Sequence, residues 1–269
     1  APASAPASAP ATQASPASPA TAQASSASPA TAQPSSRPSA AVQSAQPLTG
    51  RVILIDPGHN GRNAKHAAQV ARLVDIGNGR KACDTSGTQT DGGYAEHAFT
   101  WDLANRLAAI LRAQGATVVL TRPHDIGVGP CITERAGIGN RAKADAAISI
   151  HADGAARTGY GFHVIAPARV GGNAPIVAPS GRLAVSIRSA FARGTGEPYS
   201  TYTGGGKAIT VRKDLGGLNL SRVPKVFIEC ANMRNPADAA RLGNPAWRQK
   251  AAQSLANGLS AFVLTERPR

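Results

Sequence analysis

The stretch that most constrains the fold of this chain is Val-Ile-Leu-Ile-Asp-Pro-Gly-His, residues 52–59. Its first four residues are apolar and mostly β-branched, which indicates a strand buried on both faces of a parallel sheet. The Asp-Pro-Gly sequence that follows favours a sharp turn, because proline fixes φ and glycine permits unusual backbone angles. We therefore expect His59 at the carboxyl end of this strand, where open α/β sheets bind their ligands.

Segments with strand and helix patterns alternate through the rest of the chain. Apolar residues recur at helical spacing from Glu96 to Leu111, and Gly115 is typical of the end of such a helix. Further helices are predicted at 132–143, 183–192, 237–242 and 245–264, and further strands at 117–121, 146–150, 161–166, 209–212 and 226–229. The alternating order predicts an α/β fold: a single domain with a mostly parallel twisted sheet and helices on both faces.

Residues 1–47 differ in composition from the rest of the chain. They are almost wholly Ala, Pro, Ser, Thr and Gln, and Arg37 is their only charged side chain. Such a segment cannot bury enough apolar surface to offset the entropy of ordering, so we expect a disordered N-terminal tail and a folded domain at 48–269. The chain opens Ala-Pro-Ala-Ser without an initiator Met, which favours a mature, exported form whose targeting peptide has been removed.

The formal net charge of +14 favours a polyanionic partner. The basic residues are scattered and aromatic residues make up only 4% of the chain, so we expect no base-stacking surface and exclude nucleic acid as the main partner. No apolar run reaches the roughly 20 residues that a membrane-spanning helix needs. A cell-wall polymer that carries carboxylates is compatible with this charge.

The three cysteines fall into two classes. Cys83 and Cys131 lie in polar, glycine-rich stretches, whereas Cys230 continues an apolar run and is expected to be a buried small hydrophobe. In an exported protein the first two form the expected disulfide. Cys83 lies in residues 60–94, a polar segment too long for an ordinary connection, in which we expect a short helix at 67–73. This segment is a candidate lid or rim of a site.

Four polar side chains occupy positions where apolar ones are expected. His59 and His151 follow strands, Glu229 lies at the carboxyl end of another strand, and Glu96 shares the buried face of its helix. Two imidazoles and one carboxylate are the ligands of a catalytic zinc, and a second carboxylate then serves as acid and base. No His-Glu-x-x-His helix is present. The spacing alone does not tell which glutamate binds the metal.

Four segments together resemble a known family, the zinc-dependent N-acetylmuramoyl-L-alanine amidases, which cleave muramic acid from the stem peptide of peptidoglycan. The segments are IDPGHNG at 55–61, GGYAEHAFTWDLANRL at 92–107, ISIHADG at 148–154 and VFIECANMRNPADAARL at 226–242. Each segment is weak by itself, but their order and spacing are specific. The resemblance extends over most of residues 51–264.

The resemblance implies that His59, Glu96 and His151 bind Zn²⁺ and that Glu229 is the catalytic acid and base. It implies that 48–269 form a zinc amidase domain, acting in the periplasm or cell wall on peptidoglycan or a muropeptide. We expect a monomer, and the sequence identifies no protein activator. Asn235 matches a family asparagine and is expected to cap the helix that follows it.

Two departures from the family pattern are visible. Asn60 replaces the usual glycine after the first histidine, which we expect to affect substrate contacts rather than metal binding. The connection from His59 to Glu96 is also longer than the usual one. The remaining histidines have no role in this scheme and are expected to be structural or exposed: His66, His97, His124 and His163.

Two alternative functions remain open at this stage. The first is another zinc cell-wall hydrolase, a peptidase or a deacetylase, which would use the same metal ligands on a different bond. The second is a catalytically silent module that binds or regulates the wall. The retention of two imidazoles and two carboxylates favours an enzyme over the silent module.

Overall fold

The computed structural model describes residues 46–266. The disorder predicted for the tail therefore concerns residues that lie almost entirely outside the described part of the chain. Within that part, no helix is both long enough and apolar enough to cross a membrane.

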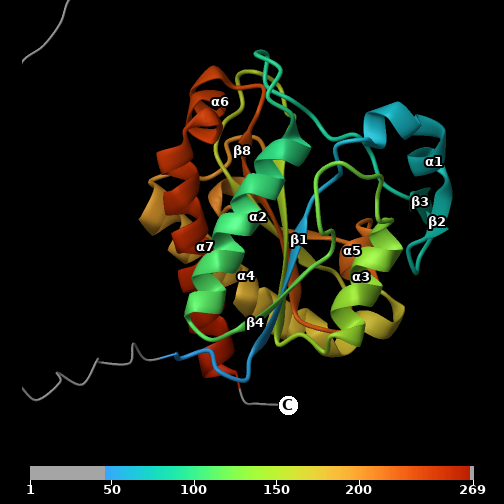
Figure 1. Ribbon diagram of the computed structural model, residues 1–269, viewed down its shortest axis with the longest axis vertical. Coiled ribbons are helices and arrows are strands. Elements are labelled where there is room, and N and C mark those ends of the chain that lie inside the picture. The colour runs from blue at the N-terminus through green and yellow to red at the C-terminus, as the bar shows by residue number, and fades with distance from the viewer. Residues whose placement is uncertain (1–45, 267–269) are drawn as a thin grey trace, which may run out of the picture. The chain divides into compact units, whose positions relative to one another are not determined.

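Six strands form one sheet in the order β4-β1-β5-β8-β6-β7. Three of them, β4, β1 and β8, are labelled in Figure 1. The strands are β1 (Val52–Pro57), β4 (Thr117–Leu120), β5 (Ala146–Asp153), β6 (His163–Pro167), β7 (Ile209–Arg212) and β8 (Lys225–Asn232). The first four in the sheet order are mutually parallel, which confirms the mostly parallel sheet.

The last two strands of the sheet run in the opposite direction. β6 pairs antiparallel with β8, and β7 pairs parallel with β6. The link between β5 and β6, residues 154–162, contains no helix, and a parallel crossover needs a dozen residues or more. The chain therefore returns in the opposite direction after β5.

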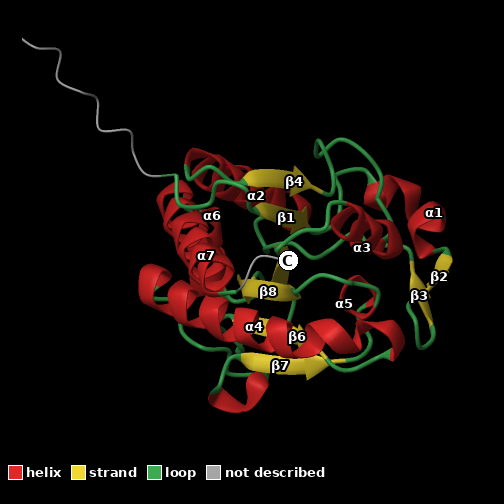
Figure 2. Cartoon of the chain, turned by 90° about the horizontal axis from the view of Figure 1, so that it is seen from below, coloured by secondary structure: helices red, strands yellow, loops and turns green. Residues whose placement is uncertain are grey.

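Helices cover both faces of the sheet (Figure 2). On one face lie α2 (Glu96–Ala113), α4 (Ala174–Thr195) and α7 (Pro245–Thr265), with α6 (Pro236–Gly243) before α7. On the other lie α3 (Ile132–Arg141) and α5 (Gly216–Asn219). The smaller elements are η1 (Asn63–His66), α1 (Ala67–Ala71), β2 (Leu73–Asp75), β3 (Arg80–Ala82), η2 (Gly171–Asn173) and η3 (Gly204–Gly206).

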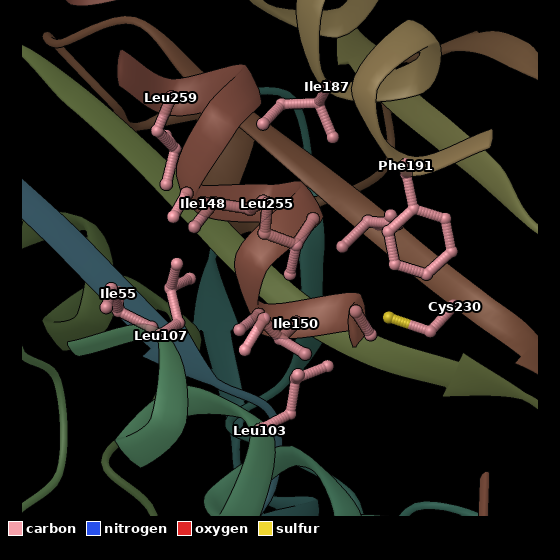
Figure 3. Close-up of a cluster of buried hydrophobic side chains, with 14 of the residues drawn as sticks. Ile55, Leu103, Leu107, Ile148, Ile150, Ile187, Phe191, Cys230, Leu255 and Leu259 are labelled. Atoms are coloured by element: carbon pink, nitrogen blue, oxygen red, sulfur yellow. The ribbon is translucent and has the colours of Figure 1, made fainter. Parts of the chain in front are cut away.

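The main core lies between the sheet and the α2, α4 and α7 helices (Figure 3). Alternate residues of the central strands point into it, including Ile55, Ile148 and Ile150, and all three are fully buried. They meet Leu103 and Leu107 of α2 at helical spacing. Burying this stripe fixes the rotation of α2, and with it the direction in which Glu96 points from the first turn.

Several elements differ in extent from their predictions. β5 continues to Asp153 and β8 to Asn232, so His151 and Glu229 lie within strands and not at their ends. Polar side chains lowered the apolar signal there, but both strands are central in the sheet and stay paired. α4 begins at Ala174 rather than at residue 183, and it contains Pro179. The hairpin of β2 and β3 within 60–94 was not predicted.

Candidate metal centre

The turn after β1 brings His59 against His151. A Cβ atom on Gly58 would lie 2.3 Å from Cε1 of His151, so only glycine allows the backbone to pass this close to the ring. His59 itself adopts a φ of 59°, an uncommon value for a residue with a side chain. Strained backbone of this kind is typical of residues held in place by their surroundings at functional sites.

Glu96 joins the two histidines. Its side chain is buried, and its Oε1 lies 3.0 Å from Nδ1 of His151 while its Oε2 lies 3.2 Å from Nε2 of His59. Two backbone amides fix the carboxylate: Ala152 N donates to Oε1 and Thr88 N donates to Oε2. The first residue of α2 therefore presents one oxygen to each imidazole.

The three side chains fit a zinc ion. One ligand atom from each of His59, Glu96 and His151 lies within 4.8 Å of the other two. Ligands bonded to tetrahedral zinc at about 2.0–2.1 Å are about 3.3 Å from one another, close to the carboxylate-to-imidazole distances just given. Phe227 stacks on the His151 ring, with centroids 5.0 Å apart and planes 11° apart, and so fixes its orientation.

The electrostatics of the cluster also favour a cation. Burial disfavours a charged His59, but Glu96 and Asp84 outweigh it and raise the pKa of His59 to about 10. Burial likewise disfavours ionised Glu96, but the two imidazoles outweigh it and hold the pKa of Glu96 far below its usual range. An ionised carboxylate therefore lies between two imidazoles, and a divalent cation would bind there by displacing a proton.

Glu229 faces the same place from β8. It pairs in register with His151 on β5 and, on its other side, with His163 on β6. Burial, followed by the negative charges of Glu96 and Asp153, raises the pKa of Glu229 well above its usual value. Among residues 46–266, no group donates a hydrogen bond to its buried Oε2. Glu229 is therefore suited to holding a proton beside the metal ligands.

A cavity of about 240 Å³ is lined by His59, Glu96, His151 and Glu229 together. A second cavity of about 190 Å³ shares His59, His151 and Phe227 with it and extends toward α3 and α5. The four predicted site residues thus face a space that is open to a ligand. Such a combination of a cavity with buried, perturbed titratable groups is typical of an active site.

The cysteines and Asn235 have the roles expected from the sequence. Cys83 and Cys131 form a disulfide, and Cys230 is a buried free thiol. The Asn235 side chain accepts hydrogen bonds from Ala237 N and Asp238 N at the start of α6, as an N-cap does.

Asn60 has a different position from the one we expected. Its side chain is buried, donates to Gly129 O, and accepts from Gly61 N and Gly127 N. It joins the turn after β1 to the 127–129 loop, so its hydrogen-bonding groups face protein and not a substrate. The effect of Asn60 on substrate contacts stays a prediction.

The other histidines divide into three groups. His66 and His124 are exposed, and His97 pairs with Asp125 at 2.7 Å. His163 is buried next to Glu229 in the sheet, and burial lowers the pKa of His163 to about 4. Sequence separation had placed it far from the site, because the antiparallel return of β6 is not visible in the sequence.

Three residues near the ligands were missed by the sequence reasoning. Phe227 was read only as part of a buried strand, although its period-2 relation to Glu229 places both on one face. Asp84 and Thr88 lie in the long segment before α2, where no periodicity indicates which side chain or amide points inward. Their contacts with His59 and Glu96 depend on the tertiary fold.

Comparisons with known proteins agree with this geometry. A family model described as N-acetylmuramoyl-L-alanine amidase matches residues 53–261. The N-acetylmuramoyl-L-alanine amidase Rv3717 of Mycobacterium tuberculosis is 41% identical over 228 residues, which cover 83% of this chain and 91% of that protein.

Solved structures show the same likeness. The amidase Ami1 of Mycobacterium smegmatis superimposes with a TM-score of 0.77 at 41% identity, covering 81% of this chain and 99% of that one. The amidase Ami1 of Mycobacterium abscessus superimposes with a TM-score of 0.73 at 40% identity, covering 80% of this chain and 99% of that one. By sequence and by fold, this chain belongs to the N-acetylmuramoyl-L-alanine amidase family.

Proposed function

We propose that this protein is a zinc-dependent amidase that hydrolyses the bond between N-acetylmuramic acid and L-alanine in peptidoglycan or muropeptides. The observation that carries the proposal is the convergence of His59, Glu96 and His151 around one point, with Glu229 facing the same cavity. Family membership supplies the substrate class.

His59 Nε2, His151 Nδ1 and a Glu96 oxygen would hold the zinc. These are the atoms that face one another, while Nδ1 of His59 faces Asp84 and Thr85 O. Bound zinc would lower the pKa of a water molecule and polarise the carbonyl group of the scissile amide. Three protein ligands leave a coordination position open, as in catalytic zinc sites generally.

Glu229 would carry the proton through the reaction. Its carboxylate takes a proton from the attacking water and then gives it to the alanine nitrogen as the amide bond breaks. The raised pKa of Glu229 suits this role, because a buried carboxylate beside other negative charges takes up a proton more readily than an exposed glutamate does.

We also propose that residues 48–269 form the catalytic domain and that it acts outside the cytoplasm. The Cys83–Cys131 disulfide supports an oxidising compartment, since such bonds are rare in the cytosol. The polymeric substrate of the family lies in the cell wall. The positive charge of the chain suits a substrate that carries carboxylates.

Mass spectrometry of the products from a purified disaccharide-peptide muropeptide tests the function. The zinc-loaded protein is expected to release an intact stem peptide with a free alanine amine. Glu229→Gln should lose most turnover, on the order of 10²-fold or more, while keeping its zinc. The matched control is Glu134→Gln, which removes an exposed carboxylate on α3 that pairs with Arg141.

Other outcomes would contradict the proposal. Cleavage within the stem peptide would identify a peptidase, and release of acetate would identify a deacetylase. A zinc-loaded protein that bound the muropeptide and left it intact would be a wall-binding module.

A further inference from the structure

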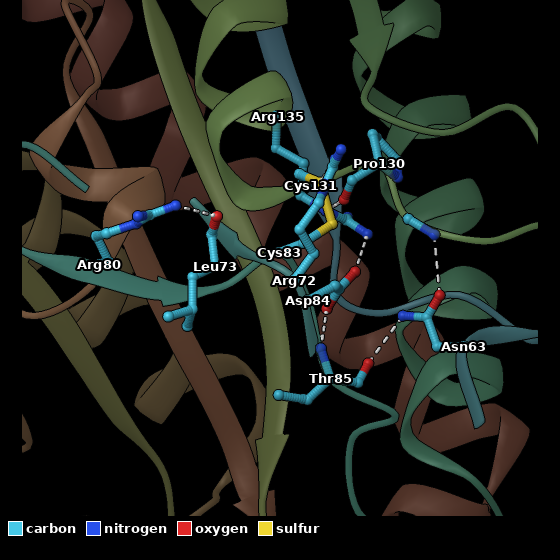
Figure 4. The surroundings of a disulfide bond; sticks show 11 residues. Asn63, Arg72, Leu73, Arg80, Cys83, Asp84, Thr85, Pro130, Cys131 and Arg135 are labelled. Carbon is cyan, nitrogen blue, oxygen red and sulfur yellow. Dashed lines mark hydrogen bonds and ion pairs between the residues drawn. A yellow bond between two sulfur atoms is a disulfide. The ribbon is translucent and has the colours of Figure 1, made fainter. Parts of the chain in front are cut away.

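The segment just before α2 forms part of the metal centre's surroundings. Asp84 Oδ1 lies 3.2 Å and Thr85 O lies 3.0 Å from Nδ1 of His59 (Figure 4 shows both residues), and Thr88 N donates to Glu96. A Cβ atom on Gly87 would lie 2.7 Å from both Glu96 Oε2 and His59 Cδ2. Residues 84–88 therefore pack directly behind two of the three metal ligands.

Asp84 is itself held rigidly. Its side chain is 7% exposed, its Oδ2 accepts from Arg135 Nη2 at 2.9 Å, and its Oδ1 accepts from Thr85 N at 2.7 Å. The same guanidinium donates to His59 O and Pro57 O. Arg135 thus connects the backbone of His59 with the carboxylate beside the His59 ring.

The disulfide joins the two elements that meet at this contact. Cys83 directly precedes Asp84, and Cys131 directly precedes α3, which carries Arg135 (Figure 4). Ile132 N also donates to Cys83 O at 2.8 Å. The covalent bond therefore limits how far Asp84 can move from Arg135 and from the His59 ring.

We propose that Asp84 is a positioning residue for His59, and that the Cys83–Cys131 disulfide keeps it in place. Together with Thr85 O, the Asp84 carboxylate accepts a hydrogen bond from Nδ1–H of His59, which leaves Nε2 as the nitrogen for the metal and orients it toward Glu96. A carboxylate behind a metal-binding histidine typically changes metal affinity or activity by about 10–100-fold. This inference rests on the metal site of the proposed function and deepens it.

Zinc affinity, measured by competition with a chelating dye on the full-length protein, tests the role of Asp84. Asp84→Asn keeps the size of the side chain but removes its charge and should weaken zinc binding about 10–100-fold. Asp91→Asn is the matched control, because Asp91 is an exposed aspartate in the same segment that pairs with Arg157 and Arg234. It should bind zinc as the unaltered protein does.

Two readouts separate positioning from a general role in stability. In the zinc-loaded protein, in which Nε2 of His59 is bound to the metal, ¹⁵N shifts of the ring should show an Nδ1–H that donates a hydrogen bond, and Asp84→Asn should shift that resonance. The visible spectrum of the Co²⁺-substituted protein should also change in Asp84→Asn and stay unchanged in Asp91→Asn. If Asp84 served only to pair with Arg135, Asp84→Asn would lower thermal stability and leave both spectra unaltered.

The disulfide is tested by replacing both Cys83 and Cys131 with serine. This variant should also bind zinc more weakly, and adding Asp84→Asn to it should cost less than Asp84→Asn does alone, because the two changes act through one contact. Additive effects would contradict the proposed link and leave the disulfide with no part in positioning Asp84.

The outcomes distinguish the two levels of the proposal. If the unaltered protein binds zinc and Asp84→Asn binds it equally well, the inference about Asp84 is wrong and the proposed function stands. If the unaltered protein binds no zinc at all, the proposed metal centre is wrong and the inference falls with it. If Asp84→Asn does not fold, the ¹⁵N spectrum of the unaltered zinc-loaded protein decides, and a His59 Nδ1 that carries no hydrogen-bonded proton overturns the inference.

Discussion

The close contact between Gly58 and the His151 ring is the tightest geometric condition at the site. It allows a strand-end backbone to lie directly against a metal-binding imidazole, and no larger residue satisfies it. The neighbouring His59 was predictable from the sequence because it follows an apolar run and a turn. The need for glycine at position 58 was not predictable, because it depends on the distance between two strands that are far apart in the sequence.

Gly58→Ala should therefore damage the metal centre. The added methyl group would displace the His151 ring, and overpacking of this kind costs about 1–3 kcal/mol of unfolding free energy. Zinc affinity should fall as well. Gly181→Ala is the control: Gly181 lies in α4 with no atom within 4 Å of the added Cβ, so thermal unfolding should show no loss of stability. Equal behaviour of the two variants in unfolding and zinc titration would refute the steric argument.

Glu229 gives the second prediction for a single residue, in the metal-free protein. The pKa of Glu229 is higher in the folded than in the unfolded state. Above about pH 4.5 the folded protein therefore keeps a proton on Glu229 that the unfolded protein has lost, and the free energy of unfolding falls as the pH rises. Glu229→Gln stays neutral and removes this cost. Its gain in unfolding free energy over the unaltered protein should be small near pH 4 and grow toward pH 7, as measured by urea unfolding. A gain that shrinks with rising pH would contradict the raised pKa.

Among the elements, β1, β8 and α3 are connected by a buried ionic network. The Asp56 carboxylate accepts from Lys225 Nζ at 2.9 Å and from Arg135 Nη1 at 3.0 Å, and it also accepts from Ser149 and Thr121. Burial opposes ionised Asp56, but Lys225 and Arg135 outweigh it and hold the pKa of Asp56 well below its usual value. The network fixes the face of the sheet on which the site is built.

Lys225→Met should test this network. Removing one partner of a buried ion pair costs about 3–5 kcal/mol, because the remaining charge is left buried with less compensation. Lys250→Met is the control, because Lys250 is exposed on α7 and forms no ion pair with any residue of 46–266. Urea unfolding at pH 7 measures both. A loss for Lys225→Met no larger than that of the control would mean that Asp56 is sufficiently neutralised by Arg135.

The elements also show how far sequence reasoning extends. The helices from Glu96, Pro236 and Pro245 were predictable because their apolar spacing and end signals agree. The hairpin at 73–82 was not, since each of its strands is only 3 residues long, too short to show a period in the sequence. Because Asp84 follows that hairpin, its position behind His59 could not be predicted either.

At the scale of the whole molecule, the residues placed in the site span 59–229, and the sheet brings them to one edge from β1, α2, β5 and β8. The parallel pairing of these strands was predictable from the alternation of strands and helices. The reversed direction of β6 and β7 was not, and it is this reversal that places His163 beside Glu229.

Removal of residues 1–45 should leave catalysis by the remaining chain intact. All proposed ligands, Glu229 and the disulfide lie within the retained residues. Turnover of a soluble muropeptide should therefore stay within about twofold of the full-length value, a difference of about 0.4 kcal/mol in the activation free energy. A loss of tenfold or more would show that the catalytic domain extends into the removed segment.

The most direct measurement of the account is anomalous diffraction at the zinc edge from a crystal of the zinc-loaded protein. We expect one strong peak about 2.0–2.2 Å from His59 Nε2, His151 Nδ1 and a Glu96 oxygen, with Glu229 beside it and unbound. A peak bound elsewhere, or none at this cluster under conditions in which the protein hydrolyses its substrate, would contradict the zinc centre on which the proposed function depends.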